Sequence, residues 1–234
     1  MKIKVLFNVI LVRLGFRKLL PKEAIRNVIV KECSEKIISL PETDFVISNK
    51  NQNICGRKTV IEKIIDINEQ LKPQNYKICV FEIYRDEATQ NNLRLQEYNN
   101  AKKEYPNYSE IDIEKIVDTR VAKIRNNNVG GHQTGGAIDL TICGIGEKEL
   151  DMGTKYLEFN DKTKTYCKGL TQEQQNNRNL LLKLMKNANF VNYPYEWWHF
   201  SYGDTMWAAY KNNTFLSIFK KKKKAIYGKI NVEN

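Results

Sequence analysis

The sequence predicts an α+β fold, because three segments have the apolar spacing of helices and three others have the character of strands. With 234 residues, the chain can bury one sizeable core, and no Pro- or Ser-rich linker divides it. We therefore expect a single domain over residues 1–234. Within it, residues 1–20 are an N-terminal extension and residues 206–234 a basic C-terminal segment.

The helices are expected where apolar residues recur every three or four positions, at residues 21–38, 58–71 and 171–186. Pro21 suits the first turn of its helix, because the N–H that it lacks would have no helical partner there. Thr171 and Gln174 have the spacing of a capping box, in which each side chain pairs with a backbone N–H at the helix start.

The strands are expected at residues 76–84, 137–143 and 195–202. In the second, alternation places Ile138, Leu140 and Ile142 on one face and Asp139 on the other. The third is aromatic and predicts a strand with a polar bend. Each carries polar candidates inside it or just past an end, where a sheet holds side chains with little mobility. The polar segments 86–103 and 109–125 are expected to be helices that form a flap over these residues.

The chain has only two histidines, and both lie in segments typical of a metal site. His132 stands in a glycine-flanked loop before the strand that carries Asp139, and Glu196 precedes His199 by three positions. Two imidazoles and one carboxylate make a three-ligand zinc site with an open position, and a nearby glutamate supplies a general base. This arrangement differs from the helical H-E-x-x-H motif, in which one helix carries both histidines. The residues therefore indicate a zinc hydrolase.

Cysteine content and charge bear on three further possibilities: a disulfide framework, a thiolate metal site and a nucleic-acid partner. The five cysteines are odd in number and show no C-x-x-C spacing, so neither a disulfide framework nor a thiolate metal site is indicated. The net charge of +11 and the lysines at 220–224 are compatible with weak phosphate binding, but no nucleic-acid-binding signature accompanies them. We interpret the lysines as solvated surface and expect no nucleic-acid partner.

The N-terminus resembles a signal peptide in its basic start and apolar run. However, Asn8 and Arg13 interrupt that run, no small-residue cleavage site follows, and the segment is too short to span a bilayer. Its apolar residues equally fit one face of a helix: Phe7, Ile10, Leu11 and Leu14. We expect a cytoplasmic protein without a membrane span, with an exported or periplasmic location as the alternative.

The order His132, Asp139, Glu196 and His199 resembles that of the VanX-type D-alanyl-D-alanine dipeptidases, which are zinc metallopeptidases. The resemblance covers roughly residues 20–205. It includes a strand that ends in Tyr84-Arg85, a Met-Gly loop at residues 151–154 and the Glu-Trp-Trp-His segment. It implies a central, mainly antiparallel sheet flanked by helices, the zinc D-Ala-D-Ala peptidase and hedgehog-like fold.

The resemblance also implies roles for individual residues. By it, His132, Asp139 and His199 bind one Zn²⁺ ion per chain, Glu196 is the catalytic base, and Arg85 stabilises charge on the scissile carbonyl. These roles agree with general chemistry, since a metal polarises a carbonyl, a carboxylate moves a proton and a guanidinium suits an oxyanion. A first-row metal other than zinc also fits this ligand set.

The chain departs from the family near the substrate. Gly130 replaces a serine that holds the substrate carboxylate, and Asp86 replaces a proline. Leu157 stands where the family has an acid that binds the substrate ammonium, so we expect the adjacent Glu158 to bind the substrate instead.

Hydrolysis of D-Ala-D-Ala or similar small D,D-dipeptides is the function that the resemblance predicts. Two alternatives remain open at this point: a D,D-carboxypeptidase that trims peptidoglycan stems, and a non-catalytic, zinc-stabilised module that binds peptidoglycan fragments. Glu196 argues against the last, because a structural zinc site normally has four protein ligands and no use for a free acid.

Overall fold

The computed structural model describes residues 3–41, 45–47, 54–124, 129–214, 217 and 221–231. Among these residues, a five-stranded sheet of order β2-β4-β5-β7-β6 forms the centre of the fold, and β1 pairs with β3 beside it. β2 runs parallel to β4, and the other neighbours in the central sheet are antiparallel. The expected α+β fold with a mainly antiparallel central sheet is confirmed.

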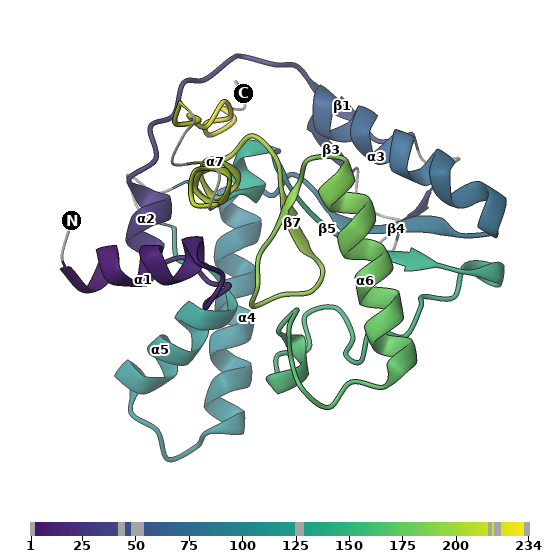
Figure 1. The fold of residues 1–234 in the computed structure, drawn as a ribbon. Helices are drawn as coiled ribbons and strands as arrows, with labels where there is room; N and C mark the ends of the chain where they lie inside the picture. Colours follow the sequence, from purple (N-terminus) through teal and green to yellow (C-terminus); the bar gives the residue numbers. More distant parts are fainter. Residues whose placement is uncertain are drawn as a thin grey trace.

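The strands are short apart from the two central ones. Their bounds are β1 (Ile37–Ser39), β2 (Val46–Ile47), β3 (Cys55–Arg57), β4 (Lys77–Glu82), β5 (Ala137–Cys143), β6 (Val191–Asn192) and β7 (His199–Ser201). The helices are α1 (Ile3–Arg13), α2 (Lys22–Arg26), α3 (Lys58–Leu71), α4 (Glu87–Glu104), α5 (Glu110–Arg120), α6 (Gln172–Asn187) and α7 (Thr205–Asn212). Figure 1 shows α3 and α6 beside the sheet, with α4 and α5 extending away from it as a pair.

The main core lies between the sheet and the helices α3 and α6. α3 buries a face with helical spacing, formed by Val60, Ile61, Ile64, Ile67 and Leu71. These side chains join the apolar residues of β4 and β5 in one cluster, which also contains Trp197 and Trp198. Both tryptophans are buried, so the aromatic segment before His199 contributes to the core as well as to the functional site.

Two of the three predicted helices are confirmed. α3 covers residues 58–71 as expected, and α6 begins after Thr171, whose side chain forms the predicted capping box with Gln174. The polar helices α4 and α5 also form, with Asp86 and Ser109 as their N-caps. Arg125, at the end of the second polar segment, lies outside the described residues.

The helix predicted over residues 21–38 is wrong beyond its first turns. α2 ends at Arg26, and the following chain is extended, with a bridge between Val30 and Ala225. Lys31 donates its backbone N–H to Ala225, and Cys33 donates to Ile226. A β-branched segment thus pairs with a part of the chain far away in sequence, and this pairing outweighs the local helical spacing.

The predicted strand at residues 195–202 is shorter than expected. Only His199–Ser201 forms β7, while the backbone N–H of Glu196 closes a turn onto Tyr193. The strand at residues 76–84 is shortened to β4, and its pairing with β5 shifts register between Val80 and Glu82.

The N-terminal residues form α1, as the apolar spacing predicted. Within the described parts of the chain, no helix combines the length and the apolarity that a bilayer crossing needs. The lysines at 221–224 are exposed, in agreement with a solvated basic segment; Lys220 lies outside the described residues.

Candidate metal centre and its pocket

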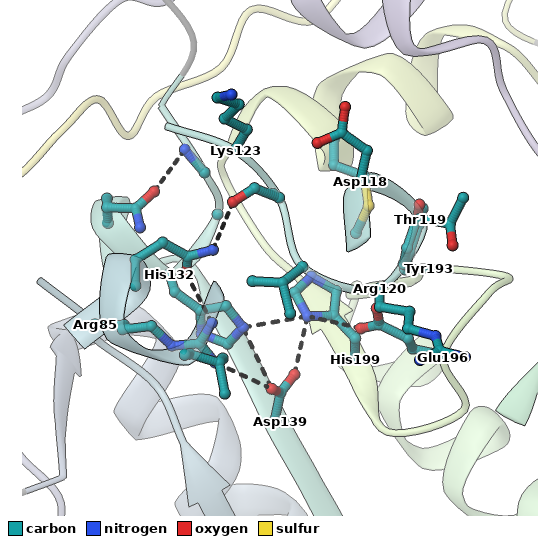
Figure 2. A pocket seen from close by; sticks show the side chains of 18 of the residues that line it. Arg85, Asp118, Thr119, Arg120, Lys123, His132, Asp139, Tyr193, Glu196 and His199 are labelled. Carbon is teal, nitrogen blue, oxygen red and sulfur yellow. Dashed lines mark hydrogen bonds and ion pairs between the residues drawn. The ribbon is translucent and has the colours of Figure 1, made fainter. Parts of the chain in front are cut away.

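The predicted ligands His132, Asp139 and His199 come together at one end of the central strands. His132 begins the turn η3 (His132–Thr134) that leads into β5, and Asp139 on β5 pairs in register with His199 on β7. Among the described residues, this is the one group of His, Cys, Asp and Glu side chains that could hold a metal ion. Figure 2 shows the three side chains pointing toward one another.

The distances within this group suit a small cation. Nε2 of His132 lies 3.2 Å from Nδ1 of His199 and 3.4 Å from Oδ2 of Asp139. Nδ1 of His199 lies 2.9 Å from Oδ1 of Asp139. One ligand atom from each residue lies within 4.8 Å of the others. Two imidazole nitrogens and a carboxylate oxygen are the donor set of a three-ligand zinc site.

A backbone contact selects the nitrogen that His132 presents. Nδ1 of His132 lies 2.7 Å from the carbonyl oxygen of Ile83, and a carbonyl only accepts, so Nδ1 carries the proton. Nε2 is then left with its lone pair and faces Asp139 and His199. A ligand histidine is commonly oriented in this way, because the contact fixes both the tautomer and the ring.

Asp139 is kept ionised in a buried position. Burial opposes its charge, but His132 and His199 hold the pKa of Asp139 well below its usual range. The hydroxyl of Tyr156 donates to Oδ2 of Asp139 at 3.1 Å. The Tyr156 ring stacks on Phe81 and meets Trp198 edge to face, so this donor is held in place from both sides.

Glu196 lies beside the three candidate metal ligands but farther from them than they lie from one another. Its Oε2 is 3.9 Å from Nδ1 of His199. Burial raises the pKa of Glu196 to about 7, although the charge of His199 opposes the shift. A carboxylate with such a pKa exchanges protons readily near neutral pH, which is the property of a general base or acid.

Arg85 follows β4 and is buried in the same pocket, whereas most arginines in proteins lie at the surface. Its guanidinium donates to Oε2 of Glu82 through Nε and to Oε1 of Gln90 through Nη1, each at 2.8 Å. Nη2 also contacts Glu82 and lies 3.8 Å from Oδ2 of Asp139. Glu82 and Gln90 therefore fix a cation next to the candidate metal ligands.

The polar helices, predicted to form a flap, contribute residues to the lining of the pocket. Gln90 and Leu93 of α4 line it, together with residues 118–123 at the end of α5. Gln90 ties the two helices to the site, because it accepts from Arg85 and donates to the carbonyl of Ala122. Figure 2 shows Asp118, Thr119, Arg120 and Lys123 on the side of the pocket that faces the histidines.

The structure does not bring Glu158 to the other predicted site residues. Glu158 is exposed, and its carboxylate accepts from the backbone N–H of Lys155 at 3.0 Å and from the side chain of Asn160 at 2.9 Å. Its neighbours Leu157 and Phe159 line the pocket instead. The loop has Leu157 at φ +60°, and its turn is closed by Glu158.

Two contacts near the site escaped the sequence reasoning. Tyr156 belongs to the loop after the Met-Gly residues, and no periodicity relates it to Asp139. Gln133 occupies the space beside Gly130, since a Cβ on Gly130 would lie 2.4 Å from its Oε1. The amide of Gln133 therefore fills the space that a side chain at position 130 would need.

Comparison with known proteins identifies relatives that match most of the chain. The family model Peptidase_M15, described as D-ala-D-ala dipeptidase, matches residues 23–221. A D-alanyl-D-alanine dipeptidase of Enterococcus faecium is 27% identical over 168 residues, which are 69% of this chain and 78% of the relative. Another, from Enterococcus faecalis, is 26% identical over 153 residues, covering 63% of this chain and 72% of the relative.

The solved structure of VanYB in complex with D-alanine-D-alanine is also similar, with a TM-score of 0.49 and 16% sequence identity. The similarity covers 85% of this chain and 95% of that chain.

Proposed function

Because this chain belongs to the Peptidase_M15 family of D-Ala-D-Ala dipeptidases and is a zinc metallopeptidase, we propose that it hydrolyses D-alanyl-D-alanine or similar small D,D-dipeptides. His132, Asp139 and His199 hold one zinc ion in this proposal. Glu196 is the general base, and Arg85 stabilises the charge that develops on the scissile carbonyl.

The donor set supports the metal assignment. His132 has its Nδ1 proton engaged by Ile83, and Asp139 is ionised, so both offer lone pairs to a cation. Three protein ligands leave a position open for substrate or water, as in catalytic zinc sites. When bound, zinc would polarise the carbonyl and lower the pKa of a water molecule.

Glu196 supplies the proton transfer. Its Oε2 takes a proton from the attacking water and returns it to the leaving amine, so the carboxylate is regenerated in each turnover. A pKa raised to about 7 by burial suits both steps, because the group is neither too weak a base nor too weak an acid.

Arg85 supplies a fixed positive charge. Glu82 and Gln90 hold the guanidinium against the pocket wall, so it is already oriented before substrate arrives. Charge that is positioned in advance stabilises an oxyanion without a reorganisation cost.

The juxtaposition of Glu196 with the His132, Asp139 and His199 group in one buried pocket carries this proposal. It is tested by metal analysis and turnover of purified variants. His132→Ala and His199→Ala should lose the metal, whereas Glu196→Gln should keep it and lose on the order of a hundredfold in turnover. Metal binding as tight as wild type in the histidine variants would make the ligand assignment wrong.

A D,D-carboxypeptidase is the second candidate, and the loop after the Met-Gly residues favours it. Leu157 lines the pocket at the position where the resemblance calls for an ammonium-binding acid, and Glu158 is committed to its own turn. A free ammonium therefore has no acid from this loop, which lowers the advantage of free dipeptides over amino-blocked ones.

A comparison of free D-alanyl-D-alanine with an N-acylated peptide ending in D-Ala-D-Ala separates the two candidates. Higher kcat/KM for the free dipeptide supports the dipeptidase. A preference for the acylated peptide, with no response to Glu158→Gln, supports the carboxypeptidase. A Glu158→Gln variant with raised KM for the dipeptide would restore the substrate-binding role predicted for Glu158.

A cytoplasmic location is part of the proposal. The cysteines of the described residues are unpaired, which agrees with a reducing compartment. Fractionation of cells that express the full chain tests this, and recovery outside the cytoplasm would favour the carboxypeptidase.

A further inference from the structure

Helix α1 carries a continuous apolar stripe that faces away from the protein. Its members are exposed and have the spacing of one helical face: Ile3 (88% exposed), Leu6 (47%), Phe7 (58%) and Ile10 (41%). Leu14 (52%), directly after the helix, continues the stripe. Phe16, in the turn that follows, is 77% exposed. An apolar surface of this kind on a folded protein usually marks a contact with a partner or a membrane.

The opposite side of α1 holds the helix on the protein. Val9 is buried in a small cluster with Leu20 and Ala209, and Val12 packs against the same cluster. Arg13 anchors the end of the helix, because its Nε donates to the side chain of Asn213 at 3.0 Å. The stripe is therefore presented outward by a helix whose inner face is already occupied. Figure 1 shows α1 at the margin of the molecule, away from the central sheet.

The charged side chains within residues 1–22 are all positive. Residues 1–22 contain no Asp or Glu. Lys4, Arg17 and Lys18 are exposed beside or just beyond the stripe. An apolar face flanked by cations fits a surface that is apolar below and anionic above.

The exposed lysines 221–224 lie at the same end of α7 as the anchor of α1. Asn212 donates through its side chain to the carbonyl of Lys223 and accepts from the Lys223 N–H, each at 2.7 Å. Arg13 of α1 contacts the carbonyl of the same Asn212. The lysine run and the apolar helix are far apart in sequence, but both form hydrogen bonds with Asn212 at the end of α7.

We propose that α1 and lysines 221–224 form one surface that binds the headgroup region of an anionic phospholipid bilayer. α1 lies in the plane of the bilayer with its stripe inserted, and the lysines contact lipid phosphates. With eleven residues, the helix is too short to cross the hydrocarbon core.

The charge pattern favours lipid over a second copy of the chain. A second copy would bring the same cations against the first, and residues 1–22 offer no acid to pair with them. A nucleic acid would satisfy the cations but leave the apolar stripe in water. An anionic bilayer satisfies both features.

Docking in this way would bring α2, which lines part of the pocket, close to the lipid surface. Lys22, Ile25 and Arg26 of the α2 region line that pocket, and α1 packs in the same cluster as α2. The binding surface is separate from the metal centre, so this proposal does not depend on the proposed reaction.

Cosedimentation of the full chain with phospholipid vesicles tests the proposal. Wild type should bind vesicles of phosphatidylcholine mixed with phosphatidylglycerol, more weakly at high salt, and bind pure phosphatidylcholine less. The double variant Phe7→Asp/Ile10→Asp should weaken binding by at least tenfold, because both side chains leave the apolar phase. Replacing lysines 221–224 by glutamine should also weaken it.

A matched control is the double variant Ile111→Asp/Ile145→Asp. Both isoleucines are exposed, at 70% and 84%, but lie in α5 and η4 (Ile145–Glu147) rather than in α1. This variant should bind vesicles like wild type. Equal weakening by the control and by the α1 variant would overturn the proposal, as would wild type that stays in the supernatant.

Two further measurements keep the test independent of how the variants fold. Amide hydrogen exchange of residues 3–16 in wild type should slow when anionic vesicles are added, and unchanged exchange would contradict the proposal. Light scattering of wild type without lipid should give a monomer. A dimer that Phe7→Asp/Ile10→Asp converts to monomer would make the stripe an interface between copies instead.

Discussion

Asp139 is contacted by a tyrosine as well as by the histidines. Its Oδ1 faces His199, and its Oδ2 receives the Tyr156 hydroxyl. The ring of Tyr156 would remain stacked on Phe81 if the hydroxyl were removed, because the stacking uses only the ring. Tyr156 is therefore a positioning residue whose polar contact can be tested apart from its packing.

Tyr156→Phe should weaken zinc binding by about tenfold, since partners of a ligand typically contribute this much to metal affinity. Competition with a chromophoric chelator measures the affinity, and thermal unfolding of metal-free protein checks the fold. Tyr108→Phe, at an exposed tyrosine between α4 and α5, is the control and should keep wild-type affinity. Equal metal affinity in Tyr156→Phe and wild type would show that Tyr156 only packs.

Glu196 makes the folding stability of the metal-free protein depend on pH. Its pKa is raised from 4.5 to about 7, so the folded state binds a proton that the unfolded state releases between these values. The stability that goes with this proton is fully present below about pH 4.5 and is lost as pH rises through about 7.

Metal-free Glu196→Gln should therefore gain stability relative to metal-free wild type as the pH rises from 5 to 8, by on the order of 3 kcal/mol. Urea unfolding at the two pH values measures the difference. A stability difference that is the same at both would contradict the assignment of a raised pKa to Glu196.

At the scale of elements, a helix cap couples α6 to the loops of the site. Thr171 accepts from the Gln174 N–H at 3.1 Å, and Gln174 accepts from the Thr171 N–H at 3.0 Å. The Gln174 side chain also donates to Asp151 at 2.9 Å, which ties the helix start to the Met-Gly loop.

Thr171→Ala should lower the free energy of unfolding by about 1 kcal/mol, because the backbone N–H of Gln174 loses its acceptor, the Thr171 hydroxyl. Thermal or urea unfolding measures this change. Lys183→Ala, on the exposed face of the same helix, should change stability much less. A loss no larger than that of the control would show that the cap has no net stabilising effect.

The element that carries Glu196 is a turn and not a strand, and this decides what the residue can do. The backbone N–H of Glu196 closes onto Tyr193, and Asn192 donates to the carbonyl of Glu196 at 3.0 Å. The side chain is thereby displaced from the line of β7 and stands to one side of His199. A straight strand would have put positions 196 and 199 on opposite faces.

At the scale of the whole molecule, the metal centre joins parts of the chain that are far apart in sequence. His132 and His199 are 67 positions apart, and Asp139 on β5 pairs in register with His199 on the neighbouring strand β7. A bound ion therefore links β5 to β7 only in the folded protein, and binding to the folded state alone adds to stability.

Removal of the metal by a chelator should lower the Tm, and the shift should reverse when zinc is added back. At a free zinc concentration a hundredfold above Kd, the expected gain is about 2.7 kcal/mol. His199→Ala serves as the control and should show no response to chelator. A wild-type Tm that is independent of zinc would contradict a metal site at these residues.

Much of the site was predictable because histidine is rare in this chain and because side chains alternate regularly along a strand. The chain has two histidines, and alternation along residues 137–143 places Asp139 on the face opposite Ile138 and Leu140, although both faces of this strand are buried. Regular apolar spacing likewise predicted α3 and α6, and a capping box marked the start of α6, since both signals lie within one stretch of chain.

Tertiary structure alone decided the rest, because it depends on pairing between distant segments. The extended course of residues 28–33 follows from their bonds to Ala225 and Ile226, and the outward position of Glu158 follows from the turn that it closes. The same holds for the Tyr156 contact with Asp139 and for the joint surface of α1 and lysines 221–224. The spacing of apolar residues predicts which face of one helix or strand is buried. The contacts named above instead arise when several helices, strands and loops pack together.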